Sequence, residues 1–272
     1  MITLASDFGS PYPAAMKGVV RRRNDAELID VSHDLPRGDP RGAAFWLRFV
    51  LPEFPPAVHC AVVDPGVGTD RAAIVVRAGE HAIVAPDNGL AIPPARALAG
   101  DRSVEVFEIA VSDPESATFH GRDVFAPAAA TVHEAITIGD ESESRTAVSA
   151  TSTALSAIPM LSPTDEYVDI ELPAVAGARV DGEPREIRGE VLVVDGFGNA
   201  ITNVPGELVR DRDRVSVDDE SVRVVETFAS VPPGTRLVTV GSHGYVECDV
   251  NEGRGADAFD LAPGDRIRIS FE

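Results

Sequence analysis

The sequence predicts a two-domain protein, in which an α/β domain with a mainly parallel sheet precedes a small antiparallel β-barrel. In the first half of the 272 residues, short apolar runs alternate with segments of helical periodicity, the order typical of βαβ units. After about residue 185, short β-rich runs alternate with turns, as in small barrels and sandwiches. We therefore place the α/β domain at residues 1–165, a linker at 166–185 and the barrel at 186–272.

The expected elements of the first half are short strands joined by turns or helices. Along the chain, we expect strands at 2–5, 27–31, 58–63, 73–76, 82–84 and 104–109, and helices at 14–23 and 39–50. The run Val58–Val63 carries no formal charge, which is typical of a strand buried on both faces of a parallel sheet. The second helix places an apolar face at Ala43, Ala44, Trp46, Leu47 and Val50.

The second half is expected to form the barrel from short strands separated by Gly, Asn, Pro and Asp. We expect these strands at 190–194, 215–217, 222–225, 236–240, 245–250 and 266–270. Their regular spacing and the turn residues between them favour antiparallel neighbours.

The chain is strongly acidic, with a formal net charge of −20 and a single lysine, Lys17. Such a field repels nucleic acid phosphates and anionic lipids, so we expect neither nucleic acid nor a membrane as a partner. Attraction of a cationic ligand is one interpretation of the acidity. Because the acidic residues are spread along the whole chain, we prefer the other interpretation, a surface adapted to high salt in a halophilic source.

Other compositional features indicate a soluble cytoplasmic protein without a metal. No apolar run approaches the roughly 20 residues that span a bilayer, and the segment Met1–Asp7 lacks a basic leader. Cys60 and Cys248 lie in apolar strand-like stretches, where buried free thiols are expected. The histidines show no spacing typical of metal ligands.

Polar side chains follow several of the predicted strands. Asp7 follows the first strand, where a carboxylate can bind a ribose diol or cap a turn. Asp64 follows the most apolar strand, and pairing with Arg71 would keep it ionised or form an ordinary surface ion pair. His120 lies in a loop, where it can hold a water and titrate near neutral pH, or serve only in the structure of the loop.

Two candidate segments lie in the second half. The turn Asp195–Asn199 offers a carboxylate, an aromatic ring and an amide, a set that suits a purine edge as well as a β-hairpin turn. The segment Gly241–Glu247 places a hydroxyl and a carboxylate at the start of a strand. Taken one at a time, these segments leave the function open.

The order of the motifs is more informative than any one of them. In sequence they are Ser6-Asp-Phe-Gly9, Asp30-Val-Ser-His33, Val62-Val-Asp-Pro-Gly-Val-Gly-Thr-Asp-Arg71, Ala85-Pro-Asp-Asn-Gly-Leu90, Thr118-Phe-His-Gly-Arg-Asp-Val-Phe-Ala-Pro127 and Asp195-Gly-Phe-Gly-Asn-Ala-Ile-Thr-Asn203. In this order they resemble the SAM hydroxide adenosyltransferase family, which is related to the fluorinase and chlorinase enzymes. The resemblance extends from residue 2 to about residue 268.

The resemblance implies an α/β domain, a β-barrel and a homotrimer with S-adenosylmethionine (SAM) held at subunit interfaces. SAM is the substrate, and no cofactor or metal is implied. The implied catalytic triad is Asp64, Arg71 and His120. The residues implied to bind SAM or adenosine are Asp7 for the ribose, Asn199 and the backbone near Val250 for the adenine, Asp195, Ser242 and Glu247 for the methionine end or the nucleoside edge, and Phe197 for packing.

The implied reaction is hydrolysis of SAM to adenosine and L-methionine by in-line attack of an activated water on C5′. The sulfonium departs as a neutral thioether, so catalysis depends on a positioned nucleophile. The first alternative is a halogenase of the chlorinase type. By the resemblance, the fluorinase lacks the Asp and His of the triad and carries Ser where Gly121 stands. The second alternative is a non-catalytic SAM- or adenosine-binding protein, for which an intact triad has no use.

Two departures from the family pattern concern binding. The loop Gly9–Pro13 is about two residues shorter than expected and lacks an acidic residue, which bears on the ribose contact. His243 stands where the fluorinase has a basic residue near the methionine carboxylate, so any contact there would depend on pH.

Overall fold

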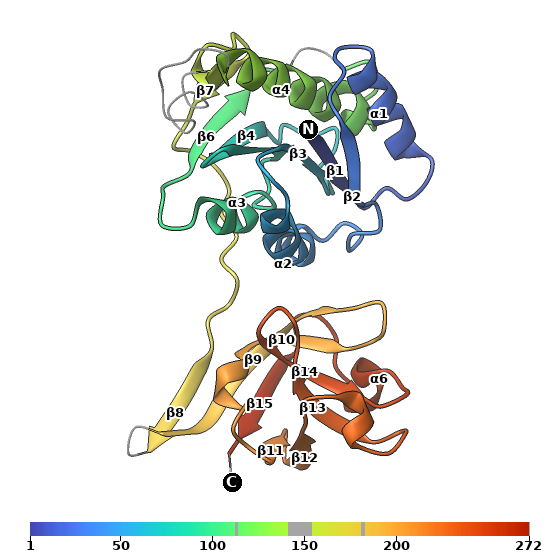
Figure 1. The fold of residues 1–272 in the computed structure, drawn as a ribbon, viewed down its shortest axis with the longest axis vertical. Coiled ribbons are helices and arrows are strands. Elements are labelled where there is room, and N and C mark those ends of the chain that lie inside the picture. The colour runs from blue at the N-terminus through green and yellow to red at the C-terminus, as the bar shows by residue number, and fades with distance from the viewer. Residues whose placement is uncertain (112–113, 141–153, 181–182, 272) are drawn as a thin grey trace. The chain divides into compact units, whose positions relative to one another are not determined.

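The computed structural model describes residues 1–111, 114–140, 154–180 and 183–271. The chain divides into two compact units, Met1–Glu171 and Leu172–Glu272, and Figure 1 shows the elements of each. The expected fold class is confirmed: the first unit is an α/β domain with one sheet, and the second is a closed β-barrel.

A seven-stranded sheet forms the centre of the first unit, with the order β2-β1-β3-β5-β4-β6-β7. Its strands are β1 Ile2–Ser6, β2 Leu28–Ser32, β3 Val58–Val62, β4 Ala73–Ala78, β5 His81–Pro86, β6 Glu105–Ile109 and β7 Leu161–Pro163. The pairs among β2, β1, β3 and β5 are parallel, whereas β4 is antiparallel to both β5 and β6, and β7 to β6. Five strands therefore run in the same direction, and the carboxyl ends of β1 and β3 lie at the same edge of the sheet.

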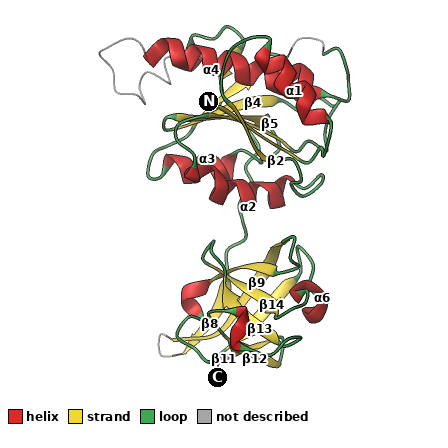
Figure 2. Cartoon of the chain, turned by 45° about the vertical axis from the view of Figure 1, so that its right-hand side comes forward, coloured by secondary structure: helices red, strands yellow, loops and turns green. Residues whose placement is uncertain are grey.

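Helices cover both faces of this sheet, as Figures 1 and 2 show. The helices α1 (Tyr12–Arg21) and α4 (Ala126–Asp140) pack on one face. The helices α2 (Pro40–Val50) and α3 (Ile92–Ala99) pack on the other. Side chains of successive strand residues point to opposite faces, so the central strands supply both cores and consist mostly of apolar residues.

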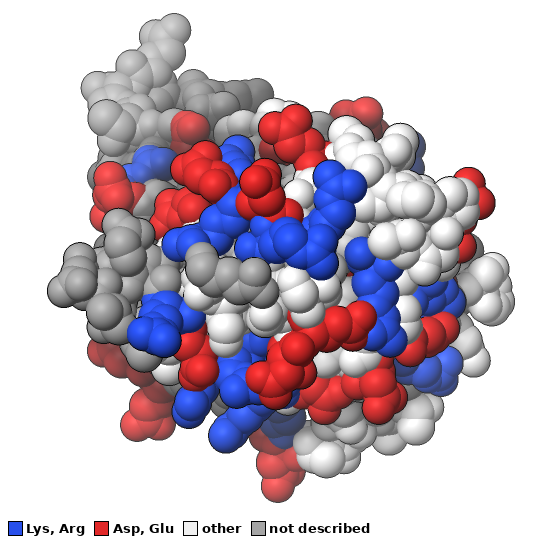
Figure 3. Space-filling view, turned by 90° about the horizontal axis from the view of Figure 1, so that it is seen from below, with Lys and Arg blue, Asp and Glu red and all other residues white. Residues whose placement is uncertain are grey.

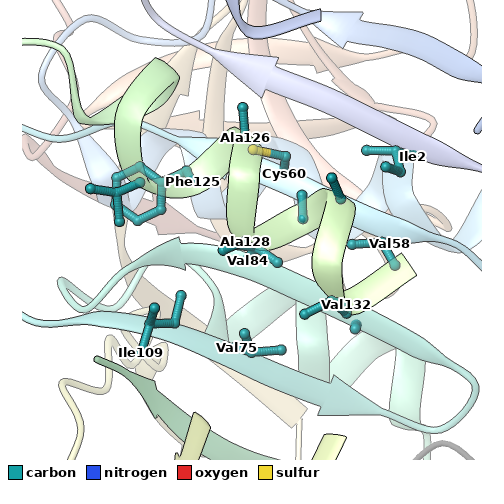
Figure 4. Packing of buried hydrophobic residues seen from close by; sticks show 14 of the residues in the cluster. Ile2, Val58, Cys60, Val75, Val84, Ile109, Phe125, Ala126, Ala128 and Val132 are labelled. Carbon is teal, nitrogen blue, oxygen red and sulfur yellow. The ribbon is translucent and has the colours of Figure 1, made fainter. Parts of the chain in front are cut away.

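The core under α4 is built from small and β-branched side chains. Ala126, Ala128 and Val132 of the helix pack over Val58 and Cys60 of β3 (Figure 4). The small side chain of alanine allows the helix to approach the sheet closely. The side of α4 that faces the strands is therefore both apolar and closely packed. Both cysteines, Cys60 and Cys248, are free and buried, as their apolar context predicted.

The helix α2 begins where the sequence predicts. The Asp39 side chain accepts hydrogen bonds from the backbone N–H groups of Arg41 and Gly42, both at 3.0 Å. A carboxylate at this position satisfies N–H groups that the first turn leaves without partners. Pro40 suits the first helical position because its missing N–H is not needed there.

Seven strands of the second unit close into a barrel, with β8 added beside β9. The strands are β8 Ala176–Val180, β9 Glu183–Val194, β10 Ala200–Pro205, β11 Arg214–Val217, β12 Glu220–Val224, β13 Arg236–Val240, β14 Tyr245–Val250 and β15 Arg266–Ser270, and a short helix α6 spans Gly255–Phe259. Pairing of β9 with β10 closes the ring.

One barrel pair differs from the expected antiparallel arrangement, because β12 and β13 are parallel. Their connection is not a hairpin. It contains a short 3-10 helix, Phe228–Ser230, before β13 begins at Arg236. This connection returns the chain to run in the same direction as β12.

No helix among the described residues is long and apolar enough to cross a membrane.

Candidate active site

Asp64 and Arg71 form a tight ion pair at the end of β3. Arg71 donates from Nε to Asp64 Oδ1 at 3.0 Å and from Nη2 to Oδ2 at 2.5 Å. The exposed fractions of the two side chains are 3% for Asp64 and 12% for Arg71. The guanidinium also lies over the ring of Phe125, 5.4 Å from its centroid. Such a two-bond pair fixes both side chains and makes the clamp specific to arginine.

The loop between the two residues folds back on itself, which allows this pairing. Thr69 donates from its backbone N–H and from its hydroxyl to the carbonyl of Gly66. Gly68 has a φ of +79°, and a Cβ there would lie 2.8 Å from the carbonyl oxygen of Ala117. Only glycine combines this backbone conformation with this close approach.

Arg71 and His120 line the same cavity, which has a volume of about 580 Å³. The lining consists of residues 68–73, residues 108–111, Pro114, Ala117, His120 and Val124. Asp64 reaches this place through its bonds to Arg71. The structure thus brings Arg71 and His120 to one cavity, with Asp64 fixed to Arg71.

His120 precedes a turn of π-helix, Gly121–Phe125, which leads into α4. A Cβ on Gly121 would lie 2.7 Å from Cε2 of Phe8 and 3.1 Å from Sδ of Met16. The Phe8 ring also contacts Phe119 edge to face, with a centroid distance of 6.1 Å. The loop after β1 and the loop of His120 therefore pack directly against each other.

Asp7, the expected ribose ligand, lies in the loop after β1. Its Oδ2 accepts a hydrogen bond of 2.8 Å from the backbone N–H of Gly38. This contact is the turn-capping role that sequence reasoning left open, and the carboxylate keeps further acceptor positions.

A chain of hydrogen bonds stabilises the loop after β1. Ser6 Oγ is 2.8 Å from Nδ1 of His33, and His33 Nε2 is 3.1 Å from Oδ1 of Asp30. Lys17 donates to the other Asp30 oxygen at 2.8 Å. The His33 carbonyl accepts from the N–H of Gly9. The motif Asp30–His33, to which sequence reasoning gave no role, thus holds the end of β1 in place.

In the second unit, Asp195 and Asn199 bond to each other. Asp195 Oδ1 accepts from the backbone N–H groups of Phe197 and Asn199, both at 2.9 Å, and Oδ2 accepts from Asn199 Nδ2 at 3.1 Å. The side chain of Asp195 therefore shapes its own turn. The exposed fraction of Phe197 is 82%, so its ring is available for contact with a ligand or another chain.

Glu247, on β14, is paired with His243. The distance from His243 Nε2 to Glu247 Oε1 is 2.8 Å, with both side chains nearly buried. The N–H of Tyr245 donates to His243 Nδ1 at 3.2 Å, which leaves the proton of a neutral imidazole on Nε2. His243 is thus engaged at both nitrogens. Ser242 is exposed, and Val250 is buried at the end of β14.

Asp249 is a feature that sequence reasoning missed. Its exposed fraction is 0%, and neither carboxylate oxygen has a hydrogen-bond partner among the described residues. Burial raises the pKa of Asp249 to about 8, and the neighbouring carboxylates of Glu247 and Asp195 act in the same direction. The available signal was an acidic residue between Cys248 and Val250 in an apolar strand.

Comparison with known proteins gives the family. Residues 2–140 match the SAM hydroxide adenosyltransferase N-terminal domain, and residues 189–268 match the C-terminal domain of the same family. A protein of Salinispora tropica named (R)-S-adenosyl-L-methionine hydrolase is 39% identical, with 99% of this chain and 97% of that protein covered. A Thermus thermophilus protein of the same name is 38% identical, with 97% of each covered.

Solved structures agree with this assignment. An uncharacterized conserved protein from Thermotoga maritima superposes with a TM-score of 0.76 at 31% identity, with all of both chains covered. A conserved hypothetical protein from Thermus thermophilus gives a TM-score of 0.67 at 33% identity, with 98% of each chain covered. With both domains matched in order and full-length relatives above 30% identity, the chain belongs to the SAM hydroxide adenosyltransferase family.

Proposed function

We propose that this protein hydrolyses SAM to adenosine and L-methionine by in-line attack of water on C5′. The observation that carries the proposal is the cavity lined by Arg71 and His120, with Asp64 clamped behind Arg71. Full-length relatives named (R)-S-adenosyl-L-methionine hydrolase support it. The sulfonium leaves as a neutral thioether, so the protein has to position a nucleophile and need not protonate the leaving atom.

The geometry suggests how the three residues divide the work. His120 lines the cavity, where its imidazole can hold the attacking water and accept a proton as the water attacks. The positive charge of Arg71 lowers the pKa of a nearby water and favours its hydroxide form. Asp64 keeps the guanidinium in one orientation through two hydrogen bonds. The residues that we propose to bind SAM or adenosine are Asp7, Asn199, Asp195, Ser242, Glu247, Phe197 and the backbone at Val250.

Packing at Gly121 favours water over halide as the nucleophile. By resemblance, the fluorinase carries serine at the position of Gly121. In this chain a Cβ there would lie 2.7 Å from the Phe8 ring, so a serine would require the loop after β1 to move. The non-catalytic alternative does not explain why the Asp64–Arg71 ion pair and His120 lie together.

Product analysis tests the reaction. Purified protein is incubated with SAM in water enriched in ¹⁸O, with and without chloride, and the products are separated by mass. We expect adenosine that carries ¹⁸O at its 5′ oxygen, with unlabelled methionine, because water attacks C5′. Preferential formation of 5′-chloro-5′-deoxyadenosine would support the halogenase instead. Tight SAM binding without adenosine over hours would support the binding protein.

We also propose that the protein is a homotrimer whose sites are completed by two subunits. The proposed residues are divided between two compact units, and the family resemblance implies shared sites. Light scattering should give the mass of three chains. Arg71→Ala and Asp195→Ala variants should each be inactive, and unfolding and refolding them together should restore part of the activity. A monomer in solution, or a mixture as inactive as its components, would contradict the proposal.

A further inference from the structure

The second unit encloses the carboxyl group of Asp249 in its interior. Asp249 is fully buried, and no donor among the described residues bonds to its oxygens; the Glu247 carboxyl is placed to hydrogen-bond with it once one of the two carries a proton. On β13, the buried Leu237 lies opposite it. The first turn of α6 closes the site, because a Cβ on Gly255 would lie 2.7 Å from Cα of Asp249. An ionised carboxylate in such a place is strongly disfavoured, so the group is expected to keep its proton.

The groups nearest to Asp249 are acidic. Glu247 lies two residues earlier on β14, on the same face of the strand. Asp195 follows Val194, which pairs with Ala200 of β10, and Ala200 pairs in turn with Cys248, the residue before Asp249; the charge of Asp195 therefore acts on Asp249. Of the Glu247 carboxylate, Oε1 lies 2.8 Å from His243 Nε2. Asp249, Glu247 and Asp195 thus form a carboxyl cluster, in which burial and the two neighbouring carboxyls favour the protonated form of Asp249.

The cations on neighbouring elements are engaged elsewhere. Arg236 of β13 pairs with Glu220 and lies over the ring of Phe259. Arg254, which precedes α6, pairs with Asp257 at 3.3 Å. The strand β10, on the other side of β14, carries no charged residue. Arg254 also lies beside the turn of Asp195, since a Cβ on Gly198 would be 3.0 Å from its guanidinium carbon. Among the described residues, however, His243 is the only cationic side chain that forms an ion pair with the carboxyl cluster.

We propose that Asp249 and Glu247 share one proton while the carboxyl cluster is free of ligand, and that a cationic ligand arriving beside Asp195 and Glu247 expels this proton to solvent. The inference rests on the proposed function, which supplies such a ligand, because SAM carries a sulfonium and an ammonium. On binding, the O–H bond of the shared proton breaks, the proton passes to water, and the charge of the ligand replaces it. Asp249 acts through Glu247 and is a positioning residue.

The sign of the pH dependence follows from the release of a proton. The pKa of Asp249 without ligand is about 8, and a nearby cation lowers it. Below pH 8 the ligand has to displace the proton, so affinity for a cation rises as the pH rises toward 8. Above pH 8 the proton is already absent, and the affinity levels off. A neutral ligand such as adenosine has no charge with which to expel the proton.

Calorimetry with an unreactive cation tests the proposal on the intact protein. The probe is sinefungin, a SAM analogue in which a carbon bearing an ammonium replaces the sulfonium. Titrations at pH 7 in two buffers with different protonation enthalpies give the number of protons released. We expect about 0.5 to 1 proton per sinefungin bound and close to none with adenosine. An absence of proton release with sinefungin would overturn the proposal.

Variants identify the source of the proton. D249N resembles the neutral acid in shape but has no proton to lose, so proton release should disappear. The affinity for sinefungin, which should rise about tenfold from pH 6 to pH 8 in the wild type, should become flat. D257N, an exposed site on α6, is the matched control and should behave as the wild type. Proton release that persists in D249N would overturn the proposal, and if D249N does not fold, the comparison of sinefungin with adenosine decides.

The two proposals fail in different ways. Proton release on sinefungin binding without any adenosine formed from SAM would remove the hydrolase and leave the carboxyl pair. Adenosine formed from SAM, with no proton released by sinefungin, would remove the carboxyl pair and leave the hydrolase.

Discussion

At the scale of single residues, the ion pair between Asp64 and Arg71 is unusual for being almost buried. Most ion pairs on protein surfaces contribute little, because water and salt screen them. Here the Asp64 side chain is 3% exposed and accepts two hydrogen bonds from one guanidinium. Removal of one partner from such a pair leaves a charge in a poorly hydrated place. Its geometry is therefore more sensitive to substitution than that of an exposed pair.

Arg71→Lys tests whether this geometry matters for the reaction. Lysine keeps the positive charge but cannot make both hydrogen bonds. We expect kcat for SAM hydrolysis to fall by about 100-fold, with a smaller change in KM, because orientation of the charge is lost. Rates are measured by adenosine release.

Arg96→Lys is the matched control for this substitution. Arg96 forms a two-bond pair with Asp169 in the same unit, but on the surface and outside the cavity lining. The rate of SAM hydrolysis by the Arg96→Lys variant should stay within about twofold of the wild type. Equal losses in the two variants would mean that Arg71 acts only on folding.

The same scale shows what sequence can and cannot reveal about a site. The order of motifs located Arg71 and His120, which share a cavity. The order of motifs could not show that Asp195 and Asn199 bond to each other, because the same residue types in a turn can either bind a ligand or stabilise the turn. Asp249 was missed because its burial depends on the cover provided by α6, which was not expected from the sequence, and a strand pattern alone would place such a side chain in water.

At the scale of elements, the contact between the loop after β1 and the π-turn before α4 sets the position of His120. Gly121→Ala tests this contact, because the added methyl would lie 2.7 Å from the Phe8 ring. We expect a loss of about 1 to 3 kcal/mol in the free energy of unfolding, together with a lower kcat. Denaturant unfolding and adenosine release measure the two effects.

A second substitution checks the cause. Phe8→Leu removes ring atoms from the contact, so the pair Gly121→Ala with Phe8→Leu should lose less stability than the sum of the two single variants. Strict additivity would mean that the two residues do not meet. Gly100→Ala is a control for the loss of glycine itself, since a Cβ there meets no atom within 4 Å although its φ of +60° adds strain.

Elements were predictable where a local signal exists. The apolar face of residues 39–50 predicted α2, and the uncharged run at 58–63 predicted the central strand β3. Helix α3 was missed because Ile92-Pro-Pro-Ala resembles a break, although proline is tolerated in the first turn of a helix. Helix α4 was missed because its first turn, Ala126-Pro-Ala-Ala-Ala130, carries no polar residue and so shows no helical periodicity.

A buried histidine in the sheet, His59, makes the stability of the first unit depend on pH. His59 of β3 bonds to Thr3 at 2.8 Å and to His81 at 3.0 Å. Burial, with a contribution from His81, lowers the pKa of His59 to about 3. In the unfolded chain the imidazole titrates near 6.5, so below that pH the unfolded state binds more protons. Stability contributed by His59 is present above pH 6.5 and decreases toward pH 3.

The expected loss is about 2 kcal/mol in the free energy of unfolding between pH 8 and pH 5. Trp46, the only tryptophan of the chain, lies in the first unit, and its fluorescence reports unfolding there. His59→Asn should reduce this pH dependence, because asparagine does not titrate. His243→Asn, in the second unit, should leave it unchanged. Identical pH profiles for His59→Asn and the wild type would show that His59 is not the group responsible.

At the scale of the whole molecule, the charge of −20 is the dominant property. Figure 3 shows a face on which arginine and acidic side chains are interspersed. Local ion pairs such as Arg188–Glu186 and Arg268–Asp219 are part of this pattern. Because the acidic residues are spread along the whole chain, we expect their excess to act as a general repulsion.

This repulsion predicts that salt stabilises the protein. Screening shortens the reach of each charge from about 10 Å at 0.1 M salt to about 3 Å at 1 M, so repulsion in the folded state weakens. We expect Tm to rise by about 5 °C or more between 0.1 and 1 M KCl, measured by calorimetry. Screening is nearly complete by 1 M, so a rise that stops there indicates relief of repulsion. A rise that continues in proportion up to 3 M indicates exclusion of salt from the surface, and a Tm that falls or stays constant would contradict the idea of a surface adapted to high salt.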